Sequence, residues 1–254
     1  MSIFKKKRKA AIAFVDYEYW YYTYQNFYSI DTDPLAWRRE LEKDYDLKDV
    51  MIFGDFSEPK ISAELPKLRT VTNTIVETGN TDSHRKKDMT DFIMLDYIYQ
   101  TVNHRKNVDA IIIFTGDGHF QSVVKYINQT LRKTAVVYGI KGSFSRQLQL
   151  AATKVVTLPA EDVLQKSYSM MIIANFARIA NKPNVIPTFR TVISAVSKRN
   201  GVPEESIRDA LQKLMEDGYV CQMVQPMKSK QGTRNVKIVV PVWDKLIRDG
   251  YWES

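Results

Sequence analysis

The stretch from Ala110 to Phe120, AIIIFTGDGHF, constrains the fold of this chain more than any other. Residues 111–114 form an unbroken apolar run rich in β-branched side chains, which is typical of a strand buried on both faces of a parallel sheet. Residues 115–118 end the strand, and their glycines permit a sharp turn. A helical pattern follows over residues 120–127. Asp117 therefore lies where a strand ends and a helix begins, which is the edge at which open α/β sheets bind ligands.

Strands and helices alternate through the first two thirds of the chain. Strands are predicted at 10–15, 50–53, 71–76, 110–114, 135–138 and 155–158, and helices at 17–28, 34–44, 86–102, 120–127 and 145–152. The aromatic residues of the first helix are interpreted mainly as core packing, with base stacking by a few rings as the alternative. This alternation predicts an α/β fold with a parallel sheet covered by helices on both faces.

The pattern changes near residue 160. Helices are predicted at 162–180, 188–199 and 203–218, followed by strands at 219–224 and 236–240 that flank a basic turn. Three helices and a hairpin predict a small winged helix-turn-helix domain. We therefore expect a basic tail over 1–9, an α/β domain over 10–160 and a winged-helix-like, nucleic-acid-binding domain over 167–254.

Composition limits the classes of protein to which the chain can belong. Its 254 residues suffice for one large domain or two modest ones, and 44% hydrophobic residues can fill a core. The single cysteine, Cys221, excludes an internal disulfide framework and a cysteine-based zinc site. No apolar run approaches the roughly 20 residues of a membrane-spanning helix, and MSIFKKKRKA is a poor signal peptide. We expect a cytoplasmic protein with no membrane association.

The net charge of +8 is distributed unevenly. Residues 167–254 contain 13 Lys/Arg and 8 Asp/Glu, and the run Lys5–Lys9 adds five positive charges, which leaves −2 for residues 10–166. A slightly acidic body with basic flanks fits a carboxylate site accompanied by nucleic-acid-binding segments, although solubility is an equally good explanation of the charge. Lys228, Lys230 and Arg234 lie in the basic turn, which is either a phosphate-binding wing or a solvated hairpin tip.

Several carboxylates are predicted to reach one edge of the sheet. Asp16 follows the first strand as Asp117 follows the fourth, and strands distant in sequence can be neighbours in a doubly wound sheet. On the long helix, Asp88 and Asp91 are three residues apart and share a face. Converging carboxylates are costly unless a cation lies between them, and magnesium or manganese is the natural occupant. Such an ion activates water and neutralises charge on a phosphate. The glycine-rich phosphate loops of nucleotide-binding proteins are absent from the sequence.

The order of these motifs resembles the NYN domain, the LabA-like branch of the PIN-like nucleases. The resemblance covers roughly residues 10–158 and is carried by Asp16, Gly54-Asp55-Phe56-Ser57, Lys87-Asp88-Met89-Thr90-Asp91, Thr115-Gly116-Asp117-Gly118-His119-Phe120 and the closing segment 145–152. It implies a PIN-like, Rossmann-like sheet and a metal-dependent ribonuclease in which Asp16, Asp91 and Asp117 hold magnesium or manganese. Asp88 is a further catalytic candidate. Lys87 and His119 are predicted to contact the nucleic acid.

The sequence departs from the family pattern at three positions. Tyr19 stands where the family often has Asn, and His119 stands where it often has a second Asp. On the long helix, Asp96 lies one place from the acidic residue expected near Tyr97. His119 and His84 are therefore alternative candidates for metal ligation or proton transfer.

Two functions from different classes compete. The three-Asp pattern favours an RNA-cleaving enzyme, whereas Tyr19 and His119 favour a catalytically degenerate regulator that binds nucleic acid. A nucleotide-binding, flavodoxin-like module is the weakest alternative because it lacks a phosphate loop. The predicted partners are RNA, DNA as an alternative ligand of the winged helix, and a second copy of the chain as a homodimer.

Overall fold

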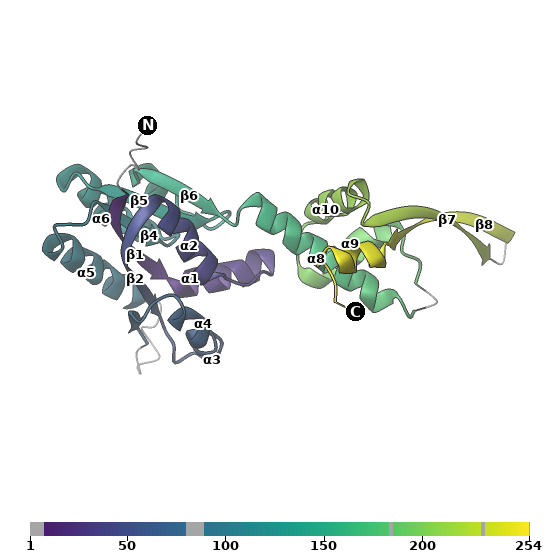
Figure 1. Cartoon of the computed structure of the whole chain (residues 1–254), viewed down its shortest axis with the longest axis horizontal. Helices are drawn as coiled ribbons and strands as arrows, with labels where there is room; N and C mark the ends of the chain where they lie inside the picture. The colour runs from purple at the N-terminus through teal and green to yellow at the C-terminus, as the bar shows by residue number, and fades with distance from the viewer. Residues whose placement is uncertain (1–7, 80–88, 183–184, 230–231, 254) are drawn as a thin grey trace, which may run out of the picture. The chain divides into compact units, whose positions relative to one another are not determined.

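The computed structural model describes residues 8–79, 89–182, 185–229 and 232–253. Contacts divide the chain into two compact units. Figure 1 shows the chain coloured by residue number. Unit 1 comprises residues up to Asn26 and Asp31–Pro159, and unit 2 comprises Phe27–Ile30 and the residues from Ala160 onward.

The described residues of unit 1 form a six-stranded sheet whose neighbouring strands are all parallel, as predicted. The strands lie in the order β3-β2-β1-β4-β5-β6. Their bounds are β1 Lys9–Asp16, β2 Tyr45–Gly54, β3 Ile75–Glu77, β4 Ala110–Phe114, β5 Thr134–Ile140 and β6 Lys154–Leu158. The chain runs outward in one direction from β1 to β3 and in the other from β4 to β6. The order therefore reverses between β1 and β4.

Helices cover both faces of this sheet (Figure 1). Ile111 and Ile113 of β4 pack into a core with α5 and α6. Phe114 faces the opposite side, where the ring of Trp20 from α1 stacks on it with centroids 4.4 Å apart. The helices are α1 Tyr17–Thr23, α2 Pro34–Asp44, α3 Pro59–Ser62, α4 Leu65–Arg69, α5 Met89–His104, α6 Gln121–Lys125 and α7 Arg146–Ala151.

One sequence-based expectation in unit 1 needs correction, and another is confirmed for two residues. The strand predicted at 71–76 is wrong in position, because only Ile75–Glu77 pairs with β2. Val71 is 1% exposed although it lies in a turn, so its apolar character reports burial and not a strand. The interpretation of the aromatic first helix as core is confirmed for Tyr17 and Trp20, which are fully or almost fully buried.

Unit 2 contains three longer helices, a hairpin and a short closing helix among its described residues. These are α8 Glu161–Ile179, α9 Phe189–Asn200, α10 Glu204–Glu216, the antiparallel strands β7 Val220–Ser229 and β8 Gly232–Pro241, and α11 Trp243–Arg248. Their buried side chains form one core in which α8, α9 and α10 meet Val220, Val239 and Leu246. The order of three helices and a hairpin agrees with the expectation, and α11 was not predicted. The extent of the basic turn is wrong, because β7 continues to Ser229 and β8 begins at Gly232, which places Lys228 and Arg234 on the strands. No helix in the described ranges has the length and apolar character needed to span a membrane.

Candidate metal centre

The neighbouring strands β1 and β4 end at the same edge of the sheet, where Asp16 is the last residue of β1 and Asp117 follows β4. Val15 of β1 lies opposite Phe114 of β4, so Asp16 and the segment leading to Asp117 leave the sheet side by side. This is also the point at which the strand order reverses, where open α/β sheets form a crevice.

A cavity of about 710 Å³ lies at this edge. Its carboxylates come from β1, α1, the loop after β2, α5 and the loop after β4: Asp16, Glu18, Asp55, Glu58, Asp91 and Asp117. The remaining lining residues are Tyr19, Tyr22, Ser57, Pro59, Thr90 and Thr115, so no Lys or Arg lines the cavity within the described part of the chain. Carboxylates crowded without a cationic side chain between them create a strongly negative potential that a multivalent cation would neutralise.

Asp16 is the most buried of these carboxylates, with 9% of its surface exposed. Its Oδ1 accepts the Tyr19 N–H at 3.0 Å and its Oδ2 accepts the Thr115 hydroxyl at 3.4 Å. Burial is the main reason why the pKa of Asp16 is raised to about 7, and the negative charges of Asp91 and Glu18 raise it further. The hydrogen bonds from the Tyr19 N–H and the Thr115 hydroxyl lower the pKa and offset part of this rise. Near neutral pH this group is therefore poised between its protonated and ionised forms.

Replacing Asp16 by Asn should change how stability depends on pH. The folded carboxyl keeps its proton up to about pH 7, whereas the unfolded one loses it near pH 4. Unfolding therefore releases a proton between these values, and the free energy of unfolding of the metal-free parent falls by up to about 1.4 kcal/mol per pH unit as pH rises. In Asp16→Asn this slope should be missing, so the variant becomes increasingly more stable than the parent as pH rises toward 7. Chemical denaturation in EDTA across this range measures the difference; parallel curves for the two proteins would contradict the assigned burial of the charge.

Asp91, Asp117 and His119 form the tightest group of potential ligands among the described residues. Each offers one atom, and the three atoms lie within 4.8 Å of one another. Asp117 caps the short 3-10 helix Gly118–Phe120 by accepting the His119 N–H at 2.8 Å, and Asp91 lies in the first turn of α5. The structure thus places Asp16, Asp91 and Asp117 around one cavity, with His119 beside two of them. Lys87, Asp88 and His84 lie outside the described residues.

Glu18 belongs to this cavity although the sequence analysis did not single it out. Its Oε2 accepts the backbone N–H of Asp55 and the hydroxyl of Thr90, each at 3.1 Å. The Thr90 hydroxyl also lies 2.6 Å from that of Thr78. Glu18 therefore ties α1 to the loop after β2 and to the helical turn that carries Asp91. Its position two residues after the Asp that ends β1 is the sequence signal that could have identified it.

Tyr19, at the position where the family often has Asn, is held firmly in place. Its hydroxyl donates to the Ser143 carbonyl at 2.6 Å and accepts the Ile140 N–H at 2.8 Å. Its ring lies against Gly116, where an added Cβ would be 2.5 Å from the ring and 2.2 Å from the Ser143 carbonyl oxygen. Neither Gly116 nor Gly118 has a positive φ, so the turn after β4 does not use the left-handed conformation that glycine permits. Close approach of neighbouring groups is what requires a glycine at 116.

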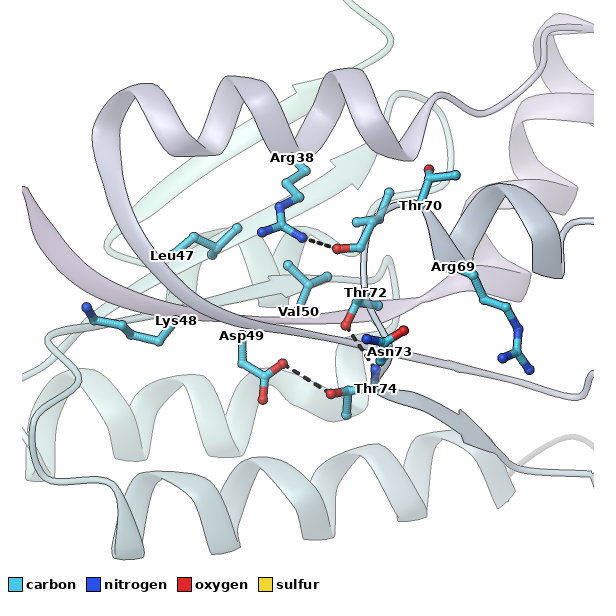
Figure 2. A pocket seen from close by; sticks show the side chains of 11 residues that line it. Arg38, Leu47, Lys48, Asp49, Val50, Arg69, Thr70, Thr72, Asn73 and Thr74 are labelled. Carbon is cyan, nitrogen blue, oxygen red and sulfur yellow. Dashed lines mark hydrogen bonds between the residues drawn. The ribbon is translucent and has the colours of Figure 1, made fainter.

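A second cavity of unit 1, of about 410 Å³, is a poor candidate for a metal site (Figure 2). It lies beside the first half of β2 and is lined by Arg38, Lys48 and Arg69. Asp49, the one carboxylate among its described lining residues, accepts the Thr74 hydroxyl at 3.2 Å and lies 3.5 Å from Arg105 Nη1. Because the charge of Asp49 is already paired with Arg105, this carboxylate is a poor metal ligand, and the other described lining residues include no second carboxylate. The acidic cavity at the end of β1 and β4 is therefore the candidate centre.

Comparisons with known proteins agree with the α/β fold of unit 1. A crystal structure of a protein of unknown function from Vibrio parahaemolyticus is similar to this chain, with a TM-score of 0.53 and 20% sequence identity. The alignment covers 63% of this chain and 97% of the other, and at this identity it shows the fold alone. No curated protein is significantly similar to the sequence. Residues 10–159 match the NYN domain family. Since this match spans more than half of the chain, the protein belongs to the NYN domain family.

Proposed function

We propose that the protein is a metal-dependent ribonuclease whose active site is the acidic cavity at the end of β1 and β4. The single observation that carries the proposal is the set of six carboxylates around one cavity that no described Lys or Arg lines. An RNA phosphate would be repelled by such a surface unless a divalent cation were present. Membership of the NYN domain family, which resembles the PIN-like nucleases, supports the same reading.

In this proposal the chain's residues divide the work by position. Asp91 and Asp117, which are partly exposed, would hold the cation together with the buried Asp16. Asp16 would give up its proton as the cation binds, because a pKa of about 7 leaves it partly protonated at neutral pH. Glu18 would keep the turn that carries Asp91 in place through Thr90. A bound magnesium or manganese ion would supply charge neutralisation at the phosphate and activation of the attacking water.

The test of this function is cleavage of single-stranded RNA by the purified chain. We expect cleavage with manganese or magnesium, none in EDTA, and recovery when the ion is restored. Absence of cleavage with every divalent ion tried, by a folded protein, would reject the ribonuclease. In that case the catalytically degenerate regulator, which Tyr19 favours, becomes the better account.

Unit 2 is proposed to bind nucleic acid through α9 and the hairpin. The exposed residues of α9 include Arg190, Lys198 and Arg199 and no acid. The exposed face of α10 carries mostly acids: Glu204, Glu205, Asp209 and Glu216, against Arg208 and Lys213. Because its exposed face is mostly acidic, α10 is poorly suited to lie in a groove lined by phosphates. Arg234 is exposed on β8, whereas Lys230 and the Lys228 side chain lie outside what the structure describes.

Replacing Lys228, Lys230 and Arg234 together by Ala should weaken RNA binding and flatten its salt dependence. Three lost phosphate contacts correspond to a decrease of about two to three in the slope of log affinity against log salt. Filter binding at several salt concentrations measures this slope. Cleavage of a short, saturating oligonucleotide should survive, because the proposed metal site lies in unit 1. An unchanged affinity and slope would show that the hairpin tip is only solvated.

A further inference from the structure

We propose that His119 is a ligand of the metal centre and makes it select a first-row transition-metal dication over magnesium. This inference rests on the proposed metal site and names the class of ion that the site takes. It concerns a position at which this chain differs from the common family pattern, since His119 stands where a second Asp is often found.

The geometry brings a ring nitrogen of His119 close to Asp91 and Asp117, two partly exposed carboxylates of the cavity. Its Nδ1 lies 3.2 Å from Asp117 Oδ1, and the ligand atoms of Asp91, Asp117 and His119 are all within 4.8 Å of one another. Ligand atoms that share one six-coordinate ion with bonds of about 2.1 Å lie roughly 3 to 4 Å apart. Only a small inward movement of these side chains is therefore needed to close them around one ion.

The exposure of the histidine ring and the hydrogen-bonded position of its backbone suit this role. The His119 side chain is 77% exposed, so rotation of the ring meets little resistance. Its backbone N–H is held by Asp117 Oδ1 at 2.8 Å, which keeps residues 117 and 119 on the same short turn. The alternative reading is a surface ion pair between His119 and Asp117, a kind of contact that contributes little to stability.

The donor set determines which ion is preferred. Magnesium is a hard ion that prefers oxygen ligands and retains much of its water. An imidazole nitrogen adds little to its binding but strengthens the binding of Co²⁺, Zn²⁺ and other first-row dications, including Mn²⁺ to a smaller degree. Two carboxylates and one imidazole therefore favour a transition-metal dication. An Asp at 119 would instead complete a set of oxygen ligands suited to magnesium.

The experiment titrates the full-length protein with Co²⁺ and, separately, with Mg²⁺ by calorimetry. The variants are His119→Ala and His119→Asp, with His104→Ala as the matched control because His104 is an exposed histidine at the far end of α5. The proton NMR spectrum of the Co²⁺-loaded protein provides a second readout, since ring protons of a cobalt-bound imidazole shift far outside the normal range. The chain contains three histidines, so these signals can be assigned with the variants.

We expect the parent and His104→Ala to bind Co²⁺ more tightly than Mg²⁺ and to show shifted ring protons. His119→Ala should lose those signals, and its affinity for Mg²⁺ should change little. Its affinity for Co²⁺ should fall at least about tenfold, because even groups that only support a metal ligand contribute that much. His119→Asp should bind Mg²⁺ at least as well as the parent and lose the preference for Co²⁺. Equal Co²⁺ affinities of the parent and His119→Ala, with no shifted ring protons, would overturn the role of His119 and leave the metal site intact. Failure of the parent to bind either ion would overturn the proposed function itself.

Discussion

Asp117→Asn should abolish metal-dependent RNA cleavage while leaving the fold intact. The variant removes a proposed metal ligand from the cavity, and the electrostatic contribution of a catalytic metal ion amounts to several kcal/mol. We therefore expect a decrease in rate on the order of a thousandfold or more. Stability should be unchanged or raised, because one of several crowded negative charges disappears. Asn can also accept the His119 N–H and cap the short helix as Asp does.

Single-turnover cleavage with manganese and a thermal melt in EDTA measure these two effects. Asp96→Asn is the matched control, since Asp96 is exposed on α5 and its Oδ2 accepts a hydrogen bond from Gln100 at 2.7 Å outside the cavity. It should retain the parental rate. If purified Asp117→Asn cut RNA as fast as the parent, Asp117 would have no part in the chemistry.

Gly116→Ala should clearly lower the stability of unit 1. A Cβ at 116 would lie 2.2 Å from the Ser143 carbonyl oxygen and 2.5 Å from the ring of Tyr19. Neither can move cheaply, because the two are joined by a 2.6 Å hydrogen bond and Ser145 N–H donates to the Gly116 carbonyl at 2.9 Å. Overpacking of this kind costs about 1 to 3 kcal/mol or more. The melting temperature should therefore fall by several degrees.

Gly54→Ala is the matched control for this substitution. Gly54 ends β2 at the same edge of the sheet, but an added Cβ there would meet its nearest neighbours at 3.5 to 3.6 Å, which is ordinary van der Waals contact. We expect its melting temperature to stay close to that of the parent. Equal melting temperatures for Gly116→Ala and Gly54→Ala would show that the loop after β4 yields to the extra methyl group.

The sequence predicts the framework of unit 1 because its signals are local. The unbroken apolar run at 110–114 marks a strand covered on both faces, and the structure confirms this: all five residues are buried. Strand ends then place Asp16 and Asp117, since the carboxyl ends of parallel strands share one edge. What the sequence cannot give is the order of the strands, and the closeness of these two residues depends on β1 and β4 being neighbours.

Features that depend on tertiary contacts could not be predicted from the sequence. Phe92 illustrates this on α5: it is 63% exposed, while Met94, Ile98 and Val102 form the buried stripe. Hydrophobicity alone would place such a ring in the core. Which residues of α5 are buried depends instead on which side of the helix faces the sheet. The tie from Glu18 to Asp55 and Thr90 joins residues far apart in sequence, and no spacing rule reveals it.

The most direct test of the central claim is a crystal of the parent protein soaked with manganese and measured at a wavelength that gives anomalous signal from the ion. The proposed function predicts an anomalous peak within coordination distance of Asp91 and Asp117, in the cavity that Asp16 also lines. The same peak should be absent from crystals of Asp117→Asn treated identically. A fully soaked crystal of the parent with no peak in this cavity, or with manganese bound only elsewhere, would contradict the assignment of the acidic cavity as the metal centre.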